Sequence, residues 1–190
     1  ITQKDIKSIK KFGVNGYMSC GYANSFLPVG LAMYTIGKAL WNDGVTFENL
    51  THQYFKSAFG ADWQECLSYI KCVSDFLDPD LRREKGFLKK EDSERYENLM
   101  YHIANFRKII EMNITNDNCC YATSWNYLKI HADITTLLVF ALENKSLGKC
   151  CKAKVIWNLL EKYLLDHKFE IESVFNVNAY ISIQGKEFEY

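Results

Sequence analysis

Apolar side chains recur every three or four residues through most of this chain, which is the spacing of amphipathic helices. The N-terminal segment Thr2–Phe12 shows this spacing, and so does Val29–Leu40 after Pro28. Beyond residue 46 the same period predicts five further helices, which contain Phe47–Ala58, Trp63–Leu77, Tyr96–Ile110, Trp125–Ala141 and Val155–Tyr163. The segment Val29–Leu40 is apolar on two sides, so we expect it to be buried between layers.

Two segments have the spacing of strands instead. Val14–Cys20 is a short run between glycines, and it predicts a strand between the first two helices. Near the C-terminus, apolar residues alternate with polar ones from Phe175 to Ile183, a period of two that predicts a second strand. The predicted fold is therefore mainly α, a helical bundle with a short N-terminal helix–strand–helix unit and a C-terminal strand.

The helical stripes also predict which side chains form the core. Each of the positions below lies on the apolar side of a predicted helix, where burial of a Leu or Phe contributes roughly 1.5–3 kcal/mol. The predicted inner residues are Met33, Leu40, Trp41, Phe47, Tyr54, Leu67, Ile70, Ile103, Phe106, Leu128, Leu138 and Leu159.

Composition narrows the class of protein. The chain has 190 residues, with 23 basic and 23 acidic side chains, and 48% of its residues are hydrophobic. These values are typical of a globular protein, and the zero formal charge predicts neither a nucleic-acid nor a membrane partner. The seven cysteines are an odd number, which leans toward a reducing, cytoplasmic compartment. The chain opens at Ile1 without a basic-then-apolar leader, so we expect a processed protein or a piece of a longer one.

Familiar catalytic and metal-binding motifs are absent from the sequence. The cysteines form no C-x-x-C pair, and His131 and Asp133 lie two apart, a spacing that suits no shared metal on a helix. No phosphate-binding glycine loop or nucleophile elbow is present, and no pair of carboxylates stands out as a glycosidase pair. We therefore predict no metal and no cofactor, and we assign no catalytic residue.

One loop has the chemistry of a binding site. Cys20–Phe26 follows a predicted strand and precedes a predicted helix, which is the layout of a barrel βα unit whose loop faces the active site. Tyr22 and Phe26 offer aromatic faces that stack on a sugar ring, and Asn24 offers an amide for its hydroxyls. We predict these three residues as the substrate-binding set. A loop that only packs a helix against its neighbour remains the alternative.

The same region carries a resemblance. Gly13-Val14-Asn15-Gly16-Tyr17, Gly21, Leu40-Trp41-Asn42 and Phe59-Gly60, in this order and spacing, form one pattern that extends to about Phe76. It resembles an uncharacterised bacterial domain-of-unknown-function family of glycoside-hydrolase-like proteins, akin to alpha-glucuronidases. The chain departs from the family's pattern at the strand end, where it has Ser19 and Cys20.

The resemblance implies a (β/α)8 barrel followed by a helical C-terminal region. Residues 1–45 would be the last part of the barrel, and residues 46–190 the helical region. The chain would then be the C-terminal portion of a carbohydrate-active protein, giving structural support and one sugar-binding loop. Since most of the barrel would lie elsewhere, we expect no catalysis from this chain alone.

The sequence also allows a function of a different class. The chain would then be a self-contained helical module that binds a protein partner. The predicted partners are therefore a carbohydrate in the full-length protein and, through the exposed edge of the N-terminal strand, a second copy of the chain.

Overall fold

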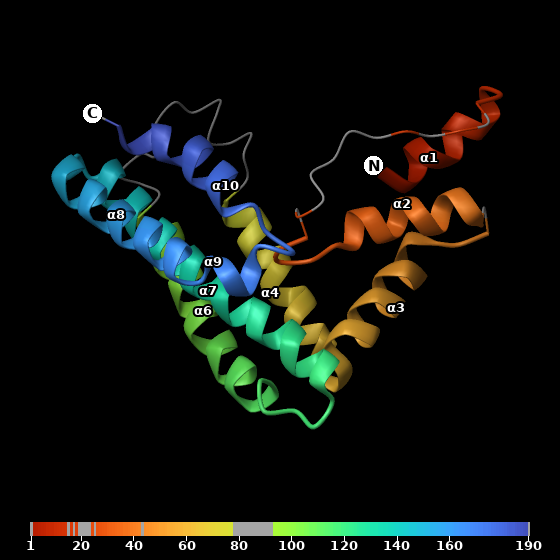
Figure 1. The fold of residues 1–190 in the computed structure, drawn as a ribbon, viewed down its shortest axis with the longest axis horizontal. Coiled ribbons are helices and arrows are strands. Elements are labelled where there is room, and N and C mark those ends of the chain that lie inside the picture. Colours follow the sequence, from red (N-terminus) through yellow and green to blue (C-terminus); the bar gives the residue numbers. More distant parts are fainter. Residues whose placement is uncertain are drawn as a thin grey trace.

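The computed structural model describes residues 2–14, 16, 18, 24, 26–42, 44–77 and 93–189. Helices account for nearly all regular structure in these ranges (Figure 1), which confirms the mainly α class. The N-terminal part contains α1 (Thr2–Lys11), α2 (Leu31–Trp41) and α3 (Phe47–Phe59), and a 3-10 turn, η1 (Gly60–Asp62), leads into α4 (Trp63–Phe76). The remainder contains α6 (Ser93–Asn113), α7 (Cys119–Ser146), α8 (Cys150–Asp166), α9 (Lys168–Ile171), α10 (Val177–Gln184) and a final 3-10 turn, η3 (Gly185–Phe188).

Local signals explain where the longer helices begin. The Thr46 hydroxyl accepts the backbone N–H of Asn49 at 3.2 Å and starts α3. The Asn118 side chain accepts the N–H groups of Cys120 and Tyr121 and starts α7. Helix α3 ends at Gly60, whose φ of 72° favours a residue without a Cβ.

Helix α7 is the centre of the molecule, with α6 and α8 packed along it (Figure 1). Its Trp125 is fully buried and donates its indole N–H to the Phe59 carbonyl of α3 at 3.0 Å. The rings of Tyr69 on α4 and Phe106 on α6 stack with centroids 4.1 Å apart. This continuous core, from α3 through α8, is the part that the helical period predicted correctly.

The predicted C-terminal strand is wrong, because residues 177–184 form α10. The Asn176 side chain accepts the N–H of Ala179 at 2.9 Å and caps this helix. Val177, Gly185 and Phe188 are buried, with Ile181 partly so, and this spacing is close to a helical period. The ring of Phe188 stacks on Trp157 of α8 at 4.9 Å, so tertiary packing selected the helical period over the alternating one.

The predicted N-terminal strand receives no support, and neither does the barrel unit built on it. Val14, Gly16 and Met18 have irregular backbone, and the other residues of the segment lie outside the described ones. No strand occurs in the ranges described here. The predicted division after residue 45 falls in the turn between α2 and α3 and stays a prediction.

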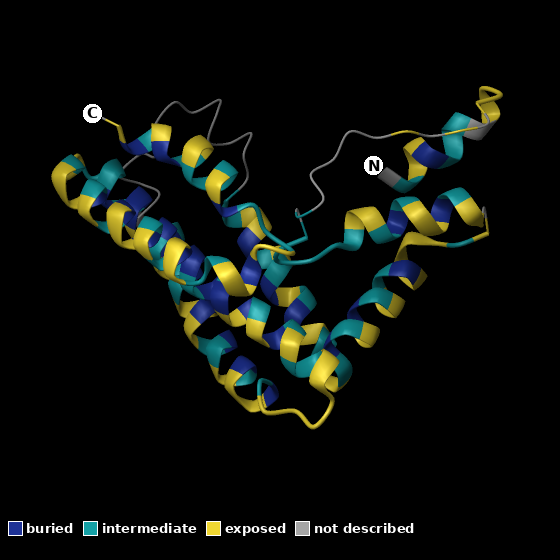
Figure 2. Ribbon diagram, in the orientation of Figure 1, coloured by how far each residue is buried: buried dark blue, intermediate teal, exposed yellow. Residues whose placement is uncertain are grey.

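Four predicted core residues are exposed, namely Met33, Trp41, Phe47 and Leu159. Ile103, Phe106, Leu128 and Leu138 are buried as expected, and the other four of the twelve are partly buried. Two of the four exposed residues, Met33 and Trp41, lie on α2. Among the described residues, the main contacts of this helix are with α1 and α3, in the arm at the right of Figure 1, and part of its surface is exposed (Figure 2).

No helix within the described ranges has both the length and the apolar character that a membrane span requires.

Candidate functional site

The structure describes two of the three predicted binding residues. Asn24 and Phe26 lie in the segment before α2, and Tyr22 lies outside the described residues. The Asn24 side chain donates to the Glu172 carbonyl at 3.0 Å, just beyond α9. The backbone N–H groups of Phe26 and Leu27 both donate to the Val174 carbonyl, at 2.7 and 3.1 Å. The predicted loop is thus tied to a segment almost 150 residues further along the chain.

Gly30 fixes the position of the Phe26 ring. A Cβ at residue 30 would lie 2.9 Å from Cδ1 of Phe26, closer than carbon atoms pack, so the ring rests directly on the glycine backbone. The N–H of Gly30 donates to the Tyr54 hydroxyl at 2.7 Å. Phe26 and Tyr54, from α3, are thus both held against the backbone of Gly30.

Phe26 and Tyr54 line a pocket of about 190 Å³, which we call the Phe26 pocket. The segment before α2 supplies Phe26 and Pro28, α3 supplies Tyr54 and Phe59, and α7 supplies Ser124 and Tyr127. The wall is thus rich in aromatic rings and uncharged. It joins two helices and a loop, where small-molecule sites commonly form.

Hydroxyl-bearing side chains give the pocket polar character, and two of them, Tyr54 and Ser124, have defined hydrogen bonds. The Tyr54 oxygen accepts from Gly30, so its own O–H remains a donor. Burial raises the pKa of Tyr54, which keeps this hydroxyl protonated at neutral pH. The Ser124 hydroxyl donates to the Cys120 carbonyl at 3.0 Å, which leaves its oxygen as an acceptor. The pocket therefore offers aromatic surface together with a donor and an acceptor.

The sequence singled out Phe26 but missed Tyr54, Ser124 and Tyr127 as site residues. Tyr54 and Tyr127 lie on helices that begin far from the loop in sequence, and no local motif marks them. The apolar period placed Tyr54 in the core, and its ring is indeed partly buried. Only the close approach of α3, α7 and the loop brings the three together.

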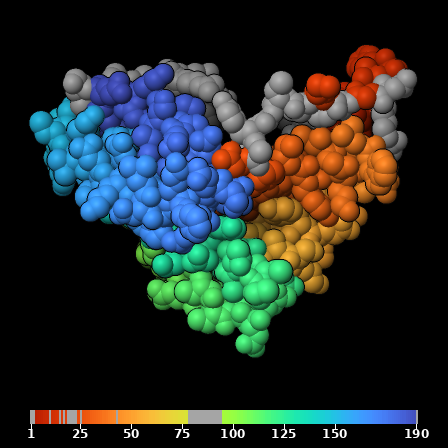
Figure 3. Space-filling view, in the orientation of Figure 1, coloured from red at the N-terminus to blue at the C-terminus, as the bar shows by residue number. Residues whose placement is uncertain are grey.

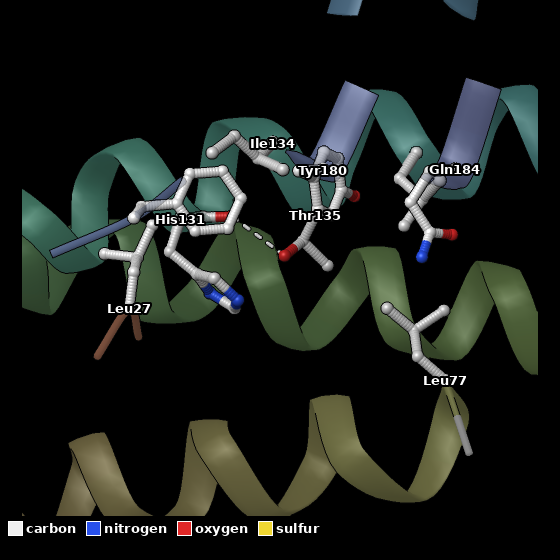
Figure 4. A pocket seen from close by; sticks show the side chains of 9 residues that line it. Leu27, Leu77, His131, Ile134, Thr135, Tyr180 and Gln184 are labelled. Atoms are coloured by element: carbon white, nitrogen blue, oxygen red, sulfur yellow. Dashed lines mark hydrogen bonds between the residues drawn. The ribbon is translucent and has the colours of Figure 1, made fainter. Parts of the chain in front are cut away.

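A second pocket, of about 200 Å³, lies between α7, α10 and the end of α4 (Figure 4). Most of its wall is aliphatic or aromatic, and its polar lining residues are His131, Thr135, Tyr180 and Gln184. The Tyr69 hydroxyl lies 2.9 Å from Nδ1 of His131. Burial lowers the pKa of His131 to about 4, so this ring is neutral at pH 7 and suits packing more than proton transfer.

Asp133 belongs to a separate polar cluster. Its carboxylate pairs with Arg107 of α6 and accepts the Tyr163 hydroxyl of α8 at 2.8 Å. Arg107 also donates to the Thr136 hydroxyl at 3.1 Å. These contacts join α6, α7 and α8. A structural role therefore accounts for Arg107, Asp133 and Tyr163.

Across the described residues, no three His, Cys, Asp or Glu side chains gather in a way that could hold a metal ion.

No family model matches this chain, and neither the curated proteins nor the solved structures include a significant match to it.

Proposed function

We propose that this chain is the helical C-terminal portion of a carbohydrate-active, glycoside-hydrolase-like protein, and that the Phe26 pocket is a binding subsite for one neutral pyranose. The observation that carries the proposal is the shared wall of this pocket, where Phe26 meets two tyrosines and a serine hydroxyl. Sugar rings bind to aromatic faces through their C–H groups and to hydroxyls through hydrogen bonds.

The dimensions of the pocket favour a single ring. Its volume of about 190 Å³ is below the range of roughly 300–1,000 Å³ that larger ligands occupy. The uncharged lining also favours a neutral sugar over a uronate, since a carboxylate would lose its hydration there without gaining a cationic partner.

The experiment is a calorimetric titration of the purified chain with methyl α-D-glucopyranoside, and with D-glucuronate as the charged comparison. We expect weak binding of the neutral sugar and at least tenfold weaker binding of glucuronate. Tyr127→Ala should weaken binding of the neutral sugar at least fivefold, since one wall of the pocket is lost.

The matched control is Tyr101→Ala, which removes an exposed tyrosine on α6 that does not line the pocket. This variant should bind the sugar as the wild type does. No binding by the wild type, or equal loss in both variants, would contradict the subsite.

A second candidate function has its own support. A helical protein-interaction module is favoured by the exposed apolar side of α2, where Met33 and Trp41 face solvent. The reading frame upstream of Ile1 discriminates between the two. Several strand–helix units with paired carboxylates would favour the carbohydrate-active protein, and a different domain or no further coding sequence would favour the module.

A further inference from the structure

The pocket between α7, α10 and the end of α4 has a mostly apolar lining, and we call it the His131 pocket (Figure 4). Leu77 and Leu138 contribute aliphatic surface to it. Phe175 and Tyr180 contribute aromatic rings, whose centroids lie 5.1 Å apart. None of the described residues that line the pocket is an Asp, Glu, Lys or Arg. The lining therefore favours a ligand that is neutral and largely apolar.

The volume of the His131 pocket suits a single six-membered ring. The pocket has a volume of about 200 Å³. An apolar cavity of about 150 Å³ in a protein interior is large enough to bind benzene. The His131 pocket therefore has room for one such ring with a small substituent.

One ring nitrogen of His131 gives the pocket a polar group without a partner. The Tyr69 hydroxyl lies 2.9 Å from Nδ1, and no described residue forms a hydrogen bond with Nε2. Among the described residues, the Thr35 hydroxyl is the only buried side-chain polar atom that lacks a hydrogen-bond partner. Nε2 of His131 is therefore accessible, and a ligand in the pocket that His131 lines can reach it.

A hydroxyl group is the partner that suits this nitrogen in either tautomer. Burial lowers the pKa of His131 to about 4, so at pH 7 one ring nitrogen is a donor and the other is an acceptor. A hydroxyl can donate to Nε2 or accept from it, whichever nitrogen carries the proton. A carboxylate could only accept, and it would lose its hydration among apolar side chains.

We propose that the His131 pocket binds a small neutral aromatic alcohol, whose hydroxyl forms a hydrogen bond with Nε2 of His131. The ring of the ligand would pack on the aliphatic side chains and on the Phe175 and Tyr180 rings. A sugar is a poor fit here, because most of its hydroxyls would face leucine and isoleucine side chains without partners. The inference goes beyond the sugar subsite and does not depend on it.

The test is an NMR titration of the purified chain with phenol, in which the Nε2 signal of His131 is followed. We expect saturable binding that shifts this signal. Toluene has nearly the same shape without the hydroxyl, and it should bind at least about fivefold more weakly. Benzoate should bind at least about tenfold more weakly because of its charge. No saturable binding of phenol, equal binding of phenol and toluene, or an unchanged Nε2 signal would overturn the proposal.

Leu77→Trp tests the location of the phenol site. Leu77 is only partly buried, and Figure 4 shows it pointing from the end of α4 toward α7, so a larger side chain can fill the pocket. This variant should lose phenol binding. The matched control is Leu165→Trp, which adds the same side chain at an exposed position on α8 that does not line the pocket. It should bind phenol as the wild type does, and equal binding by the two variants would overturn the location.

Sugar binding separates this outcome from that of the proposed function. Leu77→Trp should still bind methyl α-D-glucopyranoside, because Leu77 does not line the Phe26 pocket. Tyr127→Ala should still bind phenol, because Tyr127 does not line the His131 pocket.

Discussion

At the scale of single residues, two glycines near α2 have opposite surroundings. A Cβ at Gly30 would collide with the Phe26 ring, whereas a Cβ at Gly37 would lie in open space. Gly30→Ala should therefore lower the free energy of unfolding by about 1–3 kcal/mol, the usual cost of overpacking. Gly37→Ala should raise it by about 0.5–1 kcal/mol, because alanine is the better helix residue. Urea unfolding of both variants at low protein concentration measures the two changes in unfolding free energy. A Gly30→Ala variant at least as stable as the wild type would contradict the packing described around Phe26.

The half-buried His131 predicts a pH dependence of stability. Burial lowers the pKa of His131 to about 4 from its ordinary value of 6.5, so the unfolded chain binds the proton more readily. The stabilisation is complete above pH 6.5 and is lost as the pH falls toward 4. This group alone contributes up to about 3 kcal/mol of that loss. Replacing His131 with glutamine, whose amide can still hydrogen-bond to the Tyr69 hydroxyl, should flatten the decline in urea unfolding between pH 6.5 and 4.5. An unchanged slope would show that His131 is not buried in its neutral form.

At the scale of elements, the sequence period predicted the helices from α3 to α8 because apolar side chains recur every three or four residues in each of them, even in α7, whose buried residues lie on nearly every side. It failed for residues 175–183 because their apolar positions fit a period of two as well as a helical one. The cap at Asn176 and the stacking of Phe188 on Trp157 resolve that ambiguity, and only the first of these is local. For the candidate site, too, the sequence revealed only what was local. Phe26 stood out in its loop, but its companions Tyr54 and Tyr127 depend on contacts between distant helices.

The cap of α10 provides a direct test of this helix. Asn176→Ala removes the side chain that accepts the N–H of Ala179, and it should cost about 1 kcal/mol of unfolding free energy. Asn178→Ala changes the same residue type at an exposed position inside α10 and should be close to neutral. Thermal unfolding followed by circular dichroism at 222 nm compares the two. Equal effects would argue against a helix capped by Asn176.

At the scale of the whole molecule, α7 contributes to the helix packing, to the core and to the Phe26 pocket. It packs against α6 and α8, carries Trp125 into the core, and supplies Ser124 and Tyr127 to the Phe26 pocket. The segment before α2 closes the pocket by its hydrogen bonds to Val174. In the space-filling view, the region around α8 and the region around α2 and α3 meet above the α6–α7 turn (Figure 3). The pocket therefore depends on the packing of the assembled fold.

The central claim is that the Phe26 pocket binds a neutral pyranose. The most direct measurement is intermolecular NOE spectroscopy on the chain in the presence of methyl α-D-glucopyranoside. We predict NOEs from the sugar ring protons to the aromatic protons of Phe26, Tyr54 and Tyr127, which share the pocket wall. Tyr101 should give none. NOEs confined to residues outside this wall, or no NOEs at saturating sugar, would contradict the account.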